Sequence, residues 1–189
     1  MIKIRKYFET ILPLTDEEWT AYSSFLTKTK VPKRSYLLEP GKVCDYIAFV
    51  EEGSFRFFFN NEGNKIVTAF FFSGEFLSNY RSFLTGMPST HYIESFSDST
   101  IWMIKKEHQF LLYNQYPKFE RLGRIIAENL YLSVAKRVDS FLYETPEERY
   151  KDLLKRNSRL LQDVPQYMLA SYLGVSPESL SRIRKRISL

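Results

Sequence analysis

The chain has 189 residues, a net charge of +5 and 44% hydrophobic residues, which suits one large or two small domains with a buried core and excludes a disordered chain. Its single cysteine, Cys44, excludes an internal disulfide and a zinc or iron–sulfur site held by the cysteines of one chain. No apolar run approaches the ~20 residues of a membrane helix, and the first residues do not resemble a signal peptide, so we expect a cytoplasmic protein with no membrane partner.

The first predicted element is helical and extends from Ile2 to Thr29, with an internal start at Thr15. Thr15 and Glu18 have the spacing of a capping box, in which each side chain bonds the backbone N–H of the other residue. The apolar stripe of this helix follows at helical spacing: Trp19, Tyr22, Phe25 and Leu26.

The segment from Val31 to Ile104 has a different character. Short apolar runs rich in aromatic and β-branched residues alternate with turn signals such as Pro40-Gly41 and Glu52-Gly53. Strands at intervals of roughly ten residues predict an antiparallel barrel or sandwich. Asn60 to Gly63, between two of the apolar runs, is the clearest hairpin.

A long helical pattern follows, from about Lys106 to Tyr143, with a break near Pro117. In its second part apolar residues recur at steps of three and four, and four of them are candidates for a subunit interface: Leu122, Ile126, Leu130 and Val134. The spacing fits two arrangements equally well. The helix could pack wholly on its own domain, or it could bury part of its stripe against a second copy in a two-stranded coiled coil.

The next helix has a well-marked start. Thr145 is suited to cap it, Pro146 to its first position, and Glu148 completes a capping box. The segment from Tyr143 to Glu147 is therefore the best candidate for a domain boundary.

Residues Val164 to Arg186 contain two short helical patterns separated by Gly174. A glycine suits the left-handed turn that ends the first helix, and Ser176 and Pro177 suit the cap and the first position of the second. This layout is typical of a helix-turn-helix, whose second helix enters the major groove of DNA.

The positive charge of the chain is concentrated at its end. From Arg149 to Leu189, nine Lys and Arg residues stand against three acidic residues, so this segment carries +6 and the rest of the chain −1. Binding to the phosphates of double-stranded DNA requires such a local basic excess. The alternative is a small-molecule-binding or protein-interaction module whose basic C-terminal helices contact another partner, such as an acidic protein surface.

The order of these elements and three motifs resemble the Crp/Fnr (catabolite-activator) superfamily of transcription regulators. The motifs are Pro40 to Arg56, Gly74-Glu75-Phe76 and Ala170 to Lys185, and the resemblance covers nearly the whole chain. It implies an α+β fold, with an N-terminal cyclic-nucleotide-binding-like β-roll (a double-stranded β-helix) of about eight strands. A long dimerisation helix and a winged-helix-like, C-terminal helix-turn-helix would follow.

The resemblance also implies domain limits and partners. The sensory β-roll domain would comprise residues 1–117, the dimerisation helix 118–143 and the DNA-binding domain 144–189. The chain stops three residues after Arg186, so we expect the β-hairpin wing to be absent. A second copy of the chain in a homodimer, RNA polymerase and an unidentified small-molecule effector are the further partners that the resemblance implies.

Family members that bind cyclic nucleotides carry a glutamate for the ribose and an arginine for the cyclic phosphate. The corresponding positions here are Asn79 and, within a residue or two, Ser89, and the nearby Arg81 is displaced from the place of the arginine. A buried phosphate without a fixed cation is costly, so we expect cyclic AMP not to bind. Another effector could contact the polar residues of this region, which could equally be loop groups satisfied by the protein itself: Asn79, Arg81, Ser82, Ser89 and Thr90.

No cofactor is expected. The haem sensors of the family need an axial ligand, and His91 and His108 are more typical of ordinary surface or core histidines. The oxygen sensors need a cysteine cluster, which this chain lacks. The sequence also contains no glycine-rich phosphate loop, two-histidine metal motif or glycine-flanked nucleophilic serine, so we expect neither a metal site nor an enzyme.

Five residues of the second helix of the helix-turn-helix are candidates for contacts with DNA: Ser176, Glu178, Ser179, Arg182 and Lys185. The two serines fall in the first helical turn, where hydroxyl and backbone N–H groups bind phosphate. Glu178 and Arg182 are four residues apart, so they share a face and can brace each other, and they match base-reading positions of the resembling family. Glu178 could accept from cytosine and Arg182 could pair with guanine, whereas Lys185 would contact phosphate.

Overall fold

The computed structural model describes residues 1–156 and 158–187, and these form two compact units. Unit 1 comprises Met1–Phe59 and Ala69–Glu128, and unit 2 comprises Asn60–Thr68 and the residues from Asn129 onward. The division falls inside a hairpin and inside the long helix, so each unit combines separate segments of the chain. Across the described residues we find no helix with both the length and the apolar character needed to cross a membrane.

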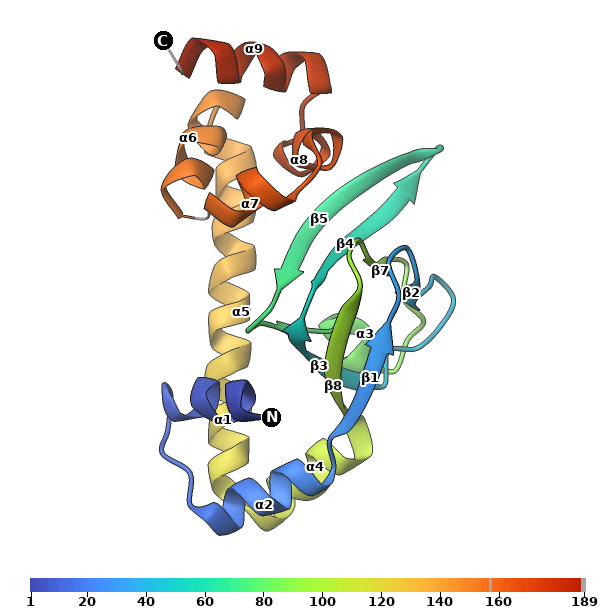
Figure 1. The fold of residues 1–189 in the computed structure, drawn as a ribbon, viewed down its shortest axis with the longest axis vertical. Coiled ribbons are helices and arrows are strands. Elements are labelled where there is room, and N and C mark those ends of the chain that lie inside the picture. Colours follow the sequence, from blue (N-terminus) through green and yellow to red (C-terminus); the bar gives the residue numbers. More distant parts are fainter. Residues whose placement is uncertain (157, 188–189) are drawn as a thin grey trace. The chain divides into compact units, whose positions relative to one another are not determined.

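The β-roll predicted from the sequence is confirmed. Eight strands in the described part of the chain form two four-stranded sheets, with the orders β1-β8-β3-β6 and β2-β7-β4-β5 (Figure 1). Neighbouring strands are antiparallel wherever their register is described. The strands are β1 (Thr27–Val31), β2 (Tyr36–Leu38), β3 (Tyr46–Glu52), β4 (Ser54–Asn61), β5 (Asn64–Phe72), β6 (Phe76–Leu77), β7 (Tyr92–Ser95) and β8 (Ser99–Lys105).

The hairpin predicted at Asn60–Gly63 joins β4 to β5. Glu62 and Gly63 have φ angles of +50° and +86°. A type I′ turn requires positive φ at both of its central residues, and its twist matches that of the two strands it joins. The turn therefore fixes the register of this hairpin locally.

Strand β5 is the last strand of its sheet, and helix α8 (Gln166–Leu173) bonds to its free edge. The Val67 N–H donates to Ser171 Oγ (3.0 Å), and the same hydroxyl donates to the Lys65 carbonyl (2.9 Å). One serine thus satisfies a donor and an acceptor that an edge strand leaves unpaired. These bonds account for the grouping of the hairpin tip with unit 2.

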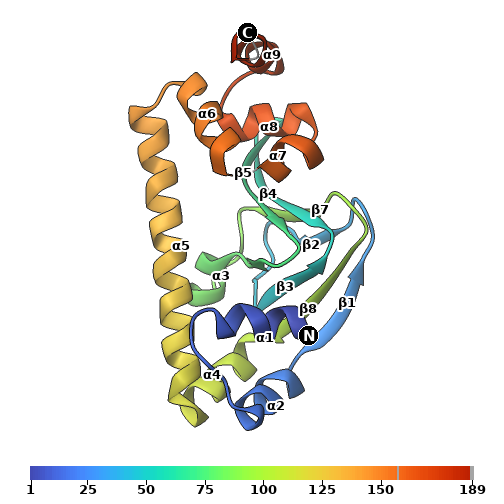
Figure 2. The ribbon, with the colours of Figure 1, turned by 60° about the vertical axis from the view of Figure 1, so that its left-hand side comes forward.

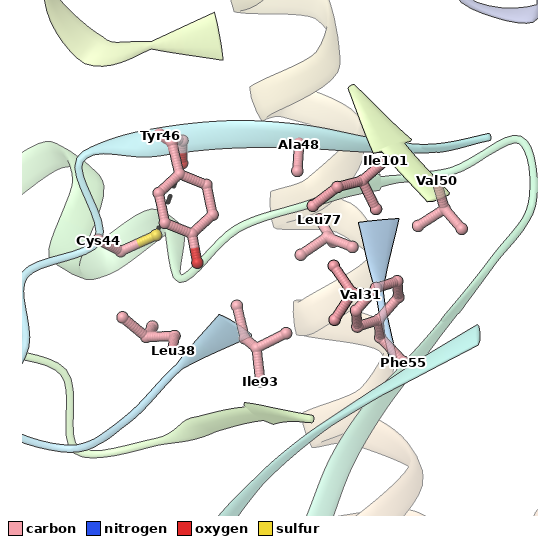
Figure 3. Close-up of a cluster of buried hydrophobic side chains, with 10 residues drawn as sticks. All are labelled: Val31, Leu38, Cys44, Tyr46, Ala48, Val50, Phe55, Leu77, Ile93 and Ile101. Atoms are coloured by element: carbon pink, nitrogen blue, oxygen red, sulfur yellow. Dashed lines mark hydrogen bonds between the residues drawn. The ribbon is translucent and has the colours of Figure 1, made fainter. Parts of the chain in front are cut away.

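Apolar side chains fill the interior of the roll. Figure 3 shows ten of them, drawn from both sheets and the connections between them, and each is less than one-tenth exposed. The polar atoms at one end have backbone partners: the Tyr46 hydroxyl donates to the Leu37 carbonyl (2.9 Å), and the Cys44 thiol donates to the Tyr46 carbonyl (3.5 Å). Because burying one large apolar side chain contributes about 1.5–3 kcal/mol, this cluster is a substantial part of the stability of unit 1.

A second apolar core lies between the sheet that contains β3 and β8 and the helices beside it. Phe49 of β3, Tyr22 and Phe119 are each at most 2% exposed in this core. Figure 2 shows the contributing helices gathered at one end of the roll. The helices of unit 1 are α1 (Ile2–Glu9), α2 (Asp16–Ser24), α3 (Tyr80–Thr85), α4 (Lys106–Gln115) and the first part of α5 (Pro117–Tyr143).

The prediction of a helical segment as far as Thr29 is wrong at its end. Helix α2 begins at the predicted cap, and both bonds of the capping box between Thr15 and Glu18 are formed. It ends at Ser24, however, and β1 begins three residues later. The alternating β-branched residues of β1 pair with β8 along its whole length, and this ladder outweighs the helical spacing of Phe25, which packs in the second core instead.

The predicted break at Pro117 is confirmed. Tyr116, between α4 and α5, has an extended backbone with φ −133° and ψ 96°, as a residue before proline prefers. Helix α5 then continues for 27 residues. It passes from unit 1 to unit 2 after Glu128.

The helix start predicted at Thr145 is confirmed, because Thr145 caps α6. The Thr145 N–H donates to Glu148 Oε2 (2.8 Å), and the Glu148 N–H donates to Thr145 Oγ1 (3.3 Å). The predicted absence of a wing concerns the chain after Ile187, which lies outside the described residues. The helices are α6 (Pro146–Arg156), α7 (Ser158–Asp163), α8 and α9 (Pro177–Ile187).

Candidate DNA-binding surface and effector site

The turn between α8 and α9 has the conformation of a helix-turn-helix. Gly174 has φ +70°, its N–H donates to the Ser171 carbonyl (3.1 Å), and the Val175 N–H donates to the Ala170 carbonyl (3.0 Å). These bonds satisfy carbonyls that the end of α8 leaves free. An added Cβ at Gly174 would lie 2.7 Å from Cε1 of Phe141, so both the backbone and the available space require glycine.

Helix α9 begins at the predicted cap. The Ser179 N–H donates to Ser176 Oγ (3.2 Å), and Pro177 is the first helical residue. Leu180 and Ile183, which are 0% and 4% exposed, form the buried face. The opposite face of α9 is consequently left for a partner or for solvent.

The five residues predicted to contact DNA come together on this open side of α9. Ser176, Glu178, Arg182 and Lys185 are exposed and Ser179 is half-buried. Arg182 Nη2 donates to Ser179 Oγ (3.2 Å), so Ser179 braces this arginine. We predicted that Glu178 would brace Arg182, but this contact is not observed. These two side chains, both in the described part of the chain, form no ion pair shorter than 4 Å.

Glu178 is nevertheless close enough to Arg182 for their charges to interact. A bond to its own backbone N–H, followed by a bond to the Ser176 hydroxyl, holds the pKa of the Glu178 carboxyl below its usual value. The charge of Arg182 adds to this lowering of the pKa. Glu178 is therefore an ionised acceptor at neutral pH.

Two grooves flank α9, and the first contains residues that the sequence did not single out. It has a volume of about 770 Å³ and is lined by Gln166 and Tyr167 at the start of α8 as well as by Glu178 and Arg182. Tyr167 is 57% exposed. The spacing of the second helix could not reveal these two residues, because they belong to the first.

The second groove, of about 1050 Å³, lies between the start of α6 and the basic end of α9. In it Glu147 forms ion pairs with Lys151 (2.9 Å) and Arg186 (3.3 Å). The bond from Lys151, followed by the charges of its basic neighbours, lowers the pKa of the Glu147 carboxyl. Glu147 therefore offsets part of the positive charge beside Lys185.

The four residues predicted for a subunit interface divide into two pairs. Leu122 is 2% exposed and Ile126 is partly buried, and both pack against the second core of their own unit. This is the self-packing arrangement, so Leu122 has no surface left for a partner. Leu130 and Val134, in contrast, are 41% and 53% exposed.

Exposed apolar residues continue along α5 beyond these positions. Five of them lie on one side of the helix, because Val134, Val138 and Leu142 follow the adjacent pair Leu130 and Tyr131 at steps of three or four residues. We call them the α5 stripe: Leu130, Tyr131, Val134, Val138 and Leu142, each between 41% and 72% exposed. Contiguous exposed apolar surfaces are typical of interaction sites in other proteins.

The residues predicted for an effector site form a buried group and an exposed pair. Asn79, Ser82 and Ser89 are 8%, 3% and 4% exposed. Asn79 Nδ2 donates to Ser89 Oγ (2.7 Å), and the Ser82 N–H donates to Asn79 Oδ1 (3.3 Å). Arg81 and Thr90 are exposed.

The hydroxyls of the buried group also have backbone partners. Ser82 Oγ donates to the Met87 carbonyl (2.6 Å) and accepts from the Cys44 N–H (3.0 Å), and Ser89 Oγ donates to the His91 carbonyl (2.8 Å). Protein groups thus already use the polar atoms of Ser82 and Ser89. We refer to Asn79, Ser82 and Ser89 as the buried network.

The exposed pair lies beside His91. Thr90 Oγ1 is 3.0 Å from His91 Nδ1, and the imidazole stacks on Phe57 with 4.5 Å between ring centres. Burial, and then the charge of Arg81, lowers the pKa of His91. Among the residues described, no group of three or more His, Cys, Asp or Glu side chains is placed to hold a metal ion.

Comparison with known proteins identifies the class of fold. Residues 28–116 match the cyclic nucleotide-binding domain family. The match includes every strand residue of the β-roll except Thr27, and the whole of α4. No curated protein sequence matches the chain significantly.

Solved structures extend the likeness from this domain to the whole chain. The c-di-GMP responsive global regulator CLP of Xanthomonas campestris superposes with a TM-score of 0.73 at 16% identity, over 92% of each chain. A regulator assigned to the Crp/Fnr family from Eubacterium rectale gives 0.72 at 17% identity, over 97% of this chain and 88% of that one. The Thermus thermophilus catabolite activator protein gives 0.61 at 18% identity, over 96% and 86%. The chain therefore has the Crp/Fnr fold that its sequence motifs predicted.

Proposed function

We propose that the chain is a homodimeric, sequence-specific DNA-binding transcription regulator whose β-roll does not bind cyclic AMP. The observation that carries this proposal is the open face of α9, where polar and basic side chains surround a capped helix that follows a left-handed glycine turn. Helix α9 belongs to the segment from Arg149 to Leu189, which holds the net positive charge of the chain. A basic helix presented in this way suits the major groove of DNA.

The position of each side chain on α9 suggests its contact. Ser176 and Ser179 lie at the amino end of α9, where the helix dipole favours an anion, and their hydroxyls would bind phosphate. Arg182 lies one turn further and would pair with guanine, and Glu178 would accept from cytosine. The bond from Arg182 to Ser179 orders the guanidinium before DNA arrives, which reduces the entropy cost of binding. Lys185 would contact phosphate.

The first groove adds Gln166 and Tyr167 to this surface. Both lie at the start of α8 and line the same groove as Arg182. Amide and phenol groups commonly donate to DNA phosphates. We therefore assign to them phosphate contacts beside the bases that α9 would read.

A second copy of the chain would bind through the α5 stripe. Its spacing suits the seam of a two-stranded coiled coil, and each of its side chains is at least 41% exposed. A two-fold axis along such a helix pair would place two α9 helices about 34 Å apart, which is one turn of DNA. The operator would then be close to a palindrome.

Cyclic AMP is not the expected effector. Asn79 and Ser89, which stand at or near the positions of the charged pair in the resembling family, are bonded to each other and carry no charge for a cyclic phosphate. A ligand that entered here would have to break this bond, at a net cost of about 1 kcal/mol, and to replace the partners of both groups. Because CLP is described as c-di-GMP responsive, this dinucleotide is the second nucleotide to test.

Selection of binding sites from a random pool of duplex DNA tests the proposal. The purified chain should enrich a nearly palindromic motif of two half-sites, and a variant with Glu178→Ala and Arg182→Ala should fail to enrich it. If no motif is enriched, and the chain is retained by an acidic protein but not by DNA at the same salt concentration, the basic helices serve a protein partner and the proposal is wrong.

A further inference from the structure

Two arginines hold the end of α8 against the last turns of α5. Arg137 of α5 donates from Nη2 to the Tyr172 carbonyl (2.8 Å), and its guanidinium carbon lies 3.8 Å from the centre of the Tyr172 ring. The same carbon is 4.9 Å from the centre of the Phe141 ring. Arg137 therefore joins two helices by a hydrogen bond and by contacts with two aromatic rings.

Arg149 of α6 completes the connection. It donates twice to the Leu173 carbonyl at the end of α8 (3.2 and 3.1 Å), and once each to the carbonyls of Ser140 (3.3 Å) and Glu144 (2.6 Å) at the end of α5. Its guanidinium carbon lies 4.7 Å from the centre of the Phe141 ring. One side chain thus satisfies carbonyls at the ends of two helices, where cations are favoured.

The ring of Phe141 also touches the turn of the helix-turn-helix. An added Cβ at Gly174 would lie 2.7 Å from this ring. The ring of Phe141 therefore lies beside Gly174 of the turn and also beside the guanidinium groups of Arg137 and Arg149. We call Arg137, Phe141 and Arg149 the arginine clamp.

We propose that the arginine clamp is a positioning device that fixes the helix-turn-helix on the end of α5 and so sets the spacing between the two recognition helices of a dimer. This inference rests on the proposed function. The segment from Tyr143 to Glu147, expected from the sequence to be a domain boundary, is bridged by the clamp and cannot serve as a free hinge. Because α5 carries the apolar stripe of the proposed dimer, a rigid joint would transmit the geometry of the helix pair to α9.

A rigid joint should affect how a dimer binds two half-sites together, and should not affect how one α9 binds a single half-site. With a rigid joint, the second α9 of a dimer meets its half-site at a high effective concentration only when the spacing is correct. With a loose joint, many spacings would be reached, and each would be bound less tightly. The clamp should therefore control selectivity for spacing while leaving the contacts of α9 with one half-site unchanged.

The test compares Arg137→Met with Lys136→Met in the full chain. Lys136 is the exposed neighbour on α5, so its replacement makes the same change in charge on another face of the helix. Each protein is titrated with a duplex carrying one half-site, with the selected palindrome, and with palindromes lengthened or shortened at the centre by two base pairs.

Wild type and Lys136→Met should prefer the selected spacing by about tenfold or more. Arg137→Met should bind the single half-site within about twofold of wild type and lose most of this preference. Arg137→Lys keeps the charge and a donor but cannot lie flat against a ring, so it should restore the preference in part. The positioning role is overturned if Arg137→Met keeps the spacing preference of wild type. It is also overturned if this variant loses binding to the single half-site along with the spacing preference.

Amide hydrogen exchange without DNA provides a readout that does not depend on the proposed function. Arg137→Met should exchange faster than wild type at residues 140–149 and 172–175, with no change at Leu180 and Ile183 in the core of the helix-turn-helix. If Arg137→Met does not change exchange at residues 140–149 and 172–175, the proposed clamp is disproved, whatever the result of the DNA-binding experiment. If wild type binds no paired half-sites while exchange at the joint responds as expected, the proposed function fails and the rigid joint stands.

Discussion

Replacing Gly174 with alanine should destabilise the protein more than the same replacement at Gly86. Both glycines follow a helix, and their φ angles are nearly the same, +70° and +71°. Their surroundings differ: an added Cβ would lie 2.7 Å from the ring of Phe141 at Gly174, whereas nothing lies within 4 Å of one at Gly86. The two variants therefore separate the cost of the backbone conformation from the cost of the contact.

The backbone cost is common to both sites. An alanine in the left-handed region costs about 1–2 kcal/mol, and alanine recovers roughly 0.4–1 kcal/mol by restricting the unfolded chain. Gly86→Ala should therefore lower the free energy of unfolding by about 1 kcal/mol. At Gly174 the Phe141 contact adds the strain of an overpacked site, about 1–3 kcal/mol, so the total loss should be about 2–4 kcal/mol.

Urea unfolding followed by circular dichroism measures both losses. A second Gly174→Ala variant, built on a Phe141→Ala background, tests the cause directly. Without the ring, the added methyl should cost about as much as it does at Gly86. Equal losses for the two single variants, or an undiminished loss on the Phe141→Ala background, would refute the steric argument.

Four further outcomes follow from the contacts described. Arg182→Ala should weaken binding to the selected operator by about 1–3 kcal/mol and leave binding to scrambled DNA unaffected. Lys185→Ala should weaken binding to both duplexes and lower the slope of the salt dependence by about one. Equal losses on the two duplexes for Arg182→Ala would show that Arg182 does not read a base. Val134→Glu should give a monomer in analytical ultracentrifugation, since an unpaired carboxylate in an apolar interface costs several kcal/mol, and a wild type that is already monomeric at micromolar concentration would contradict the dimer. Glu147→Gln should strengthen binding to any DNA and steepen its salt dependence, because it releases two basic side chains for phosphate; weaker binding would show that its ion pairs serve stability instead. Calorimetry should detect no binding of cyclic AMP, and a dissociation constant of a micromolar or less would disprove the argument from the buried network.

The features that the sequence predicted well depend on neighbouring residues. The capping boxes that begin at Thr15 and Thr145, the break at Pro117 and the left-handed end of α8 at Gly174 are each determined by a few consecutive side chains. Their energies are local, so a pattern of residues is enough to predict them. The hairpin at Asn60 belongs to the same class, because its turn requires only two residues with positive φ.

The errors and open alternatives depend on residues far apart in the chain. Phe25 continues a helical stripe, but pairing of the next residues with β8 ends the helix first. Leu122 and Val134 belong to one periodic stripe, and only the packing of α1, α2 and α4 decides that Leu122 is buried and Val134 exposed. Likewise, Asn79 and Ser89 are both polar loop residues in the sequence, and the bond between them could not be predicted from either one.

Not all of the positive charge between Arg149 and Leu189 is available to DNA. The sequence alone shows nine basic residues in this segment and does not distinguish those that have partners within the protein. In the structure, Arg149 is turned to the carbonyls at two helix ends, and Glu147 pairs with both Lys151 and Arg186. A basic residue whose donors are used inside the protein releases few counterions on binding DNA. The salt dependence of DNA binding should therefore be smaller than a count of nine suggests, with the exposed basic face of α9 around Lys185 as its main source.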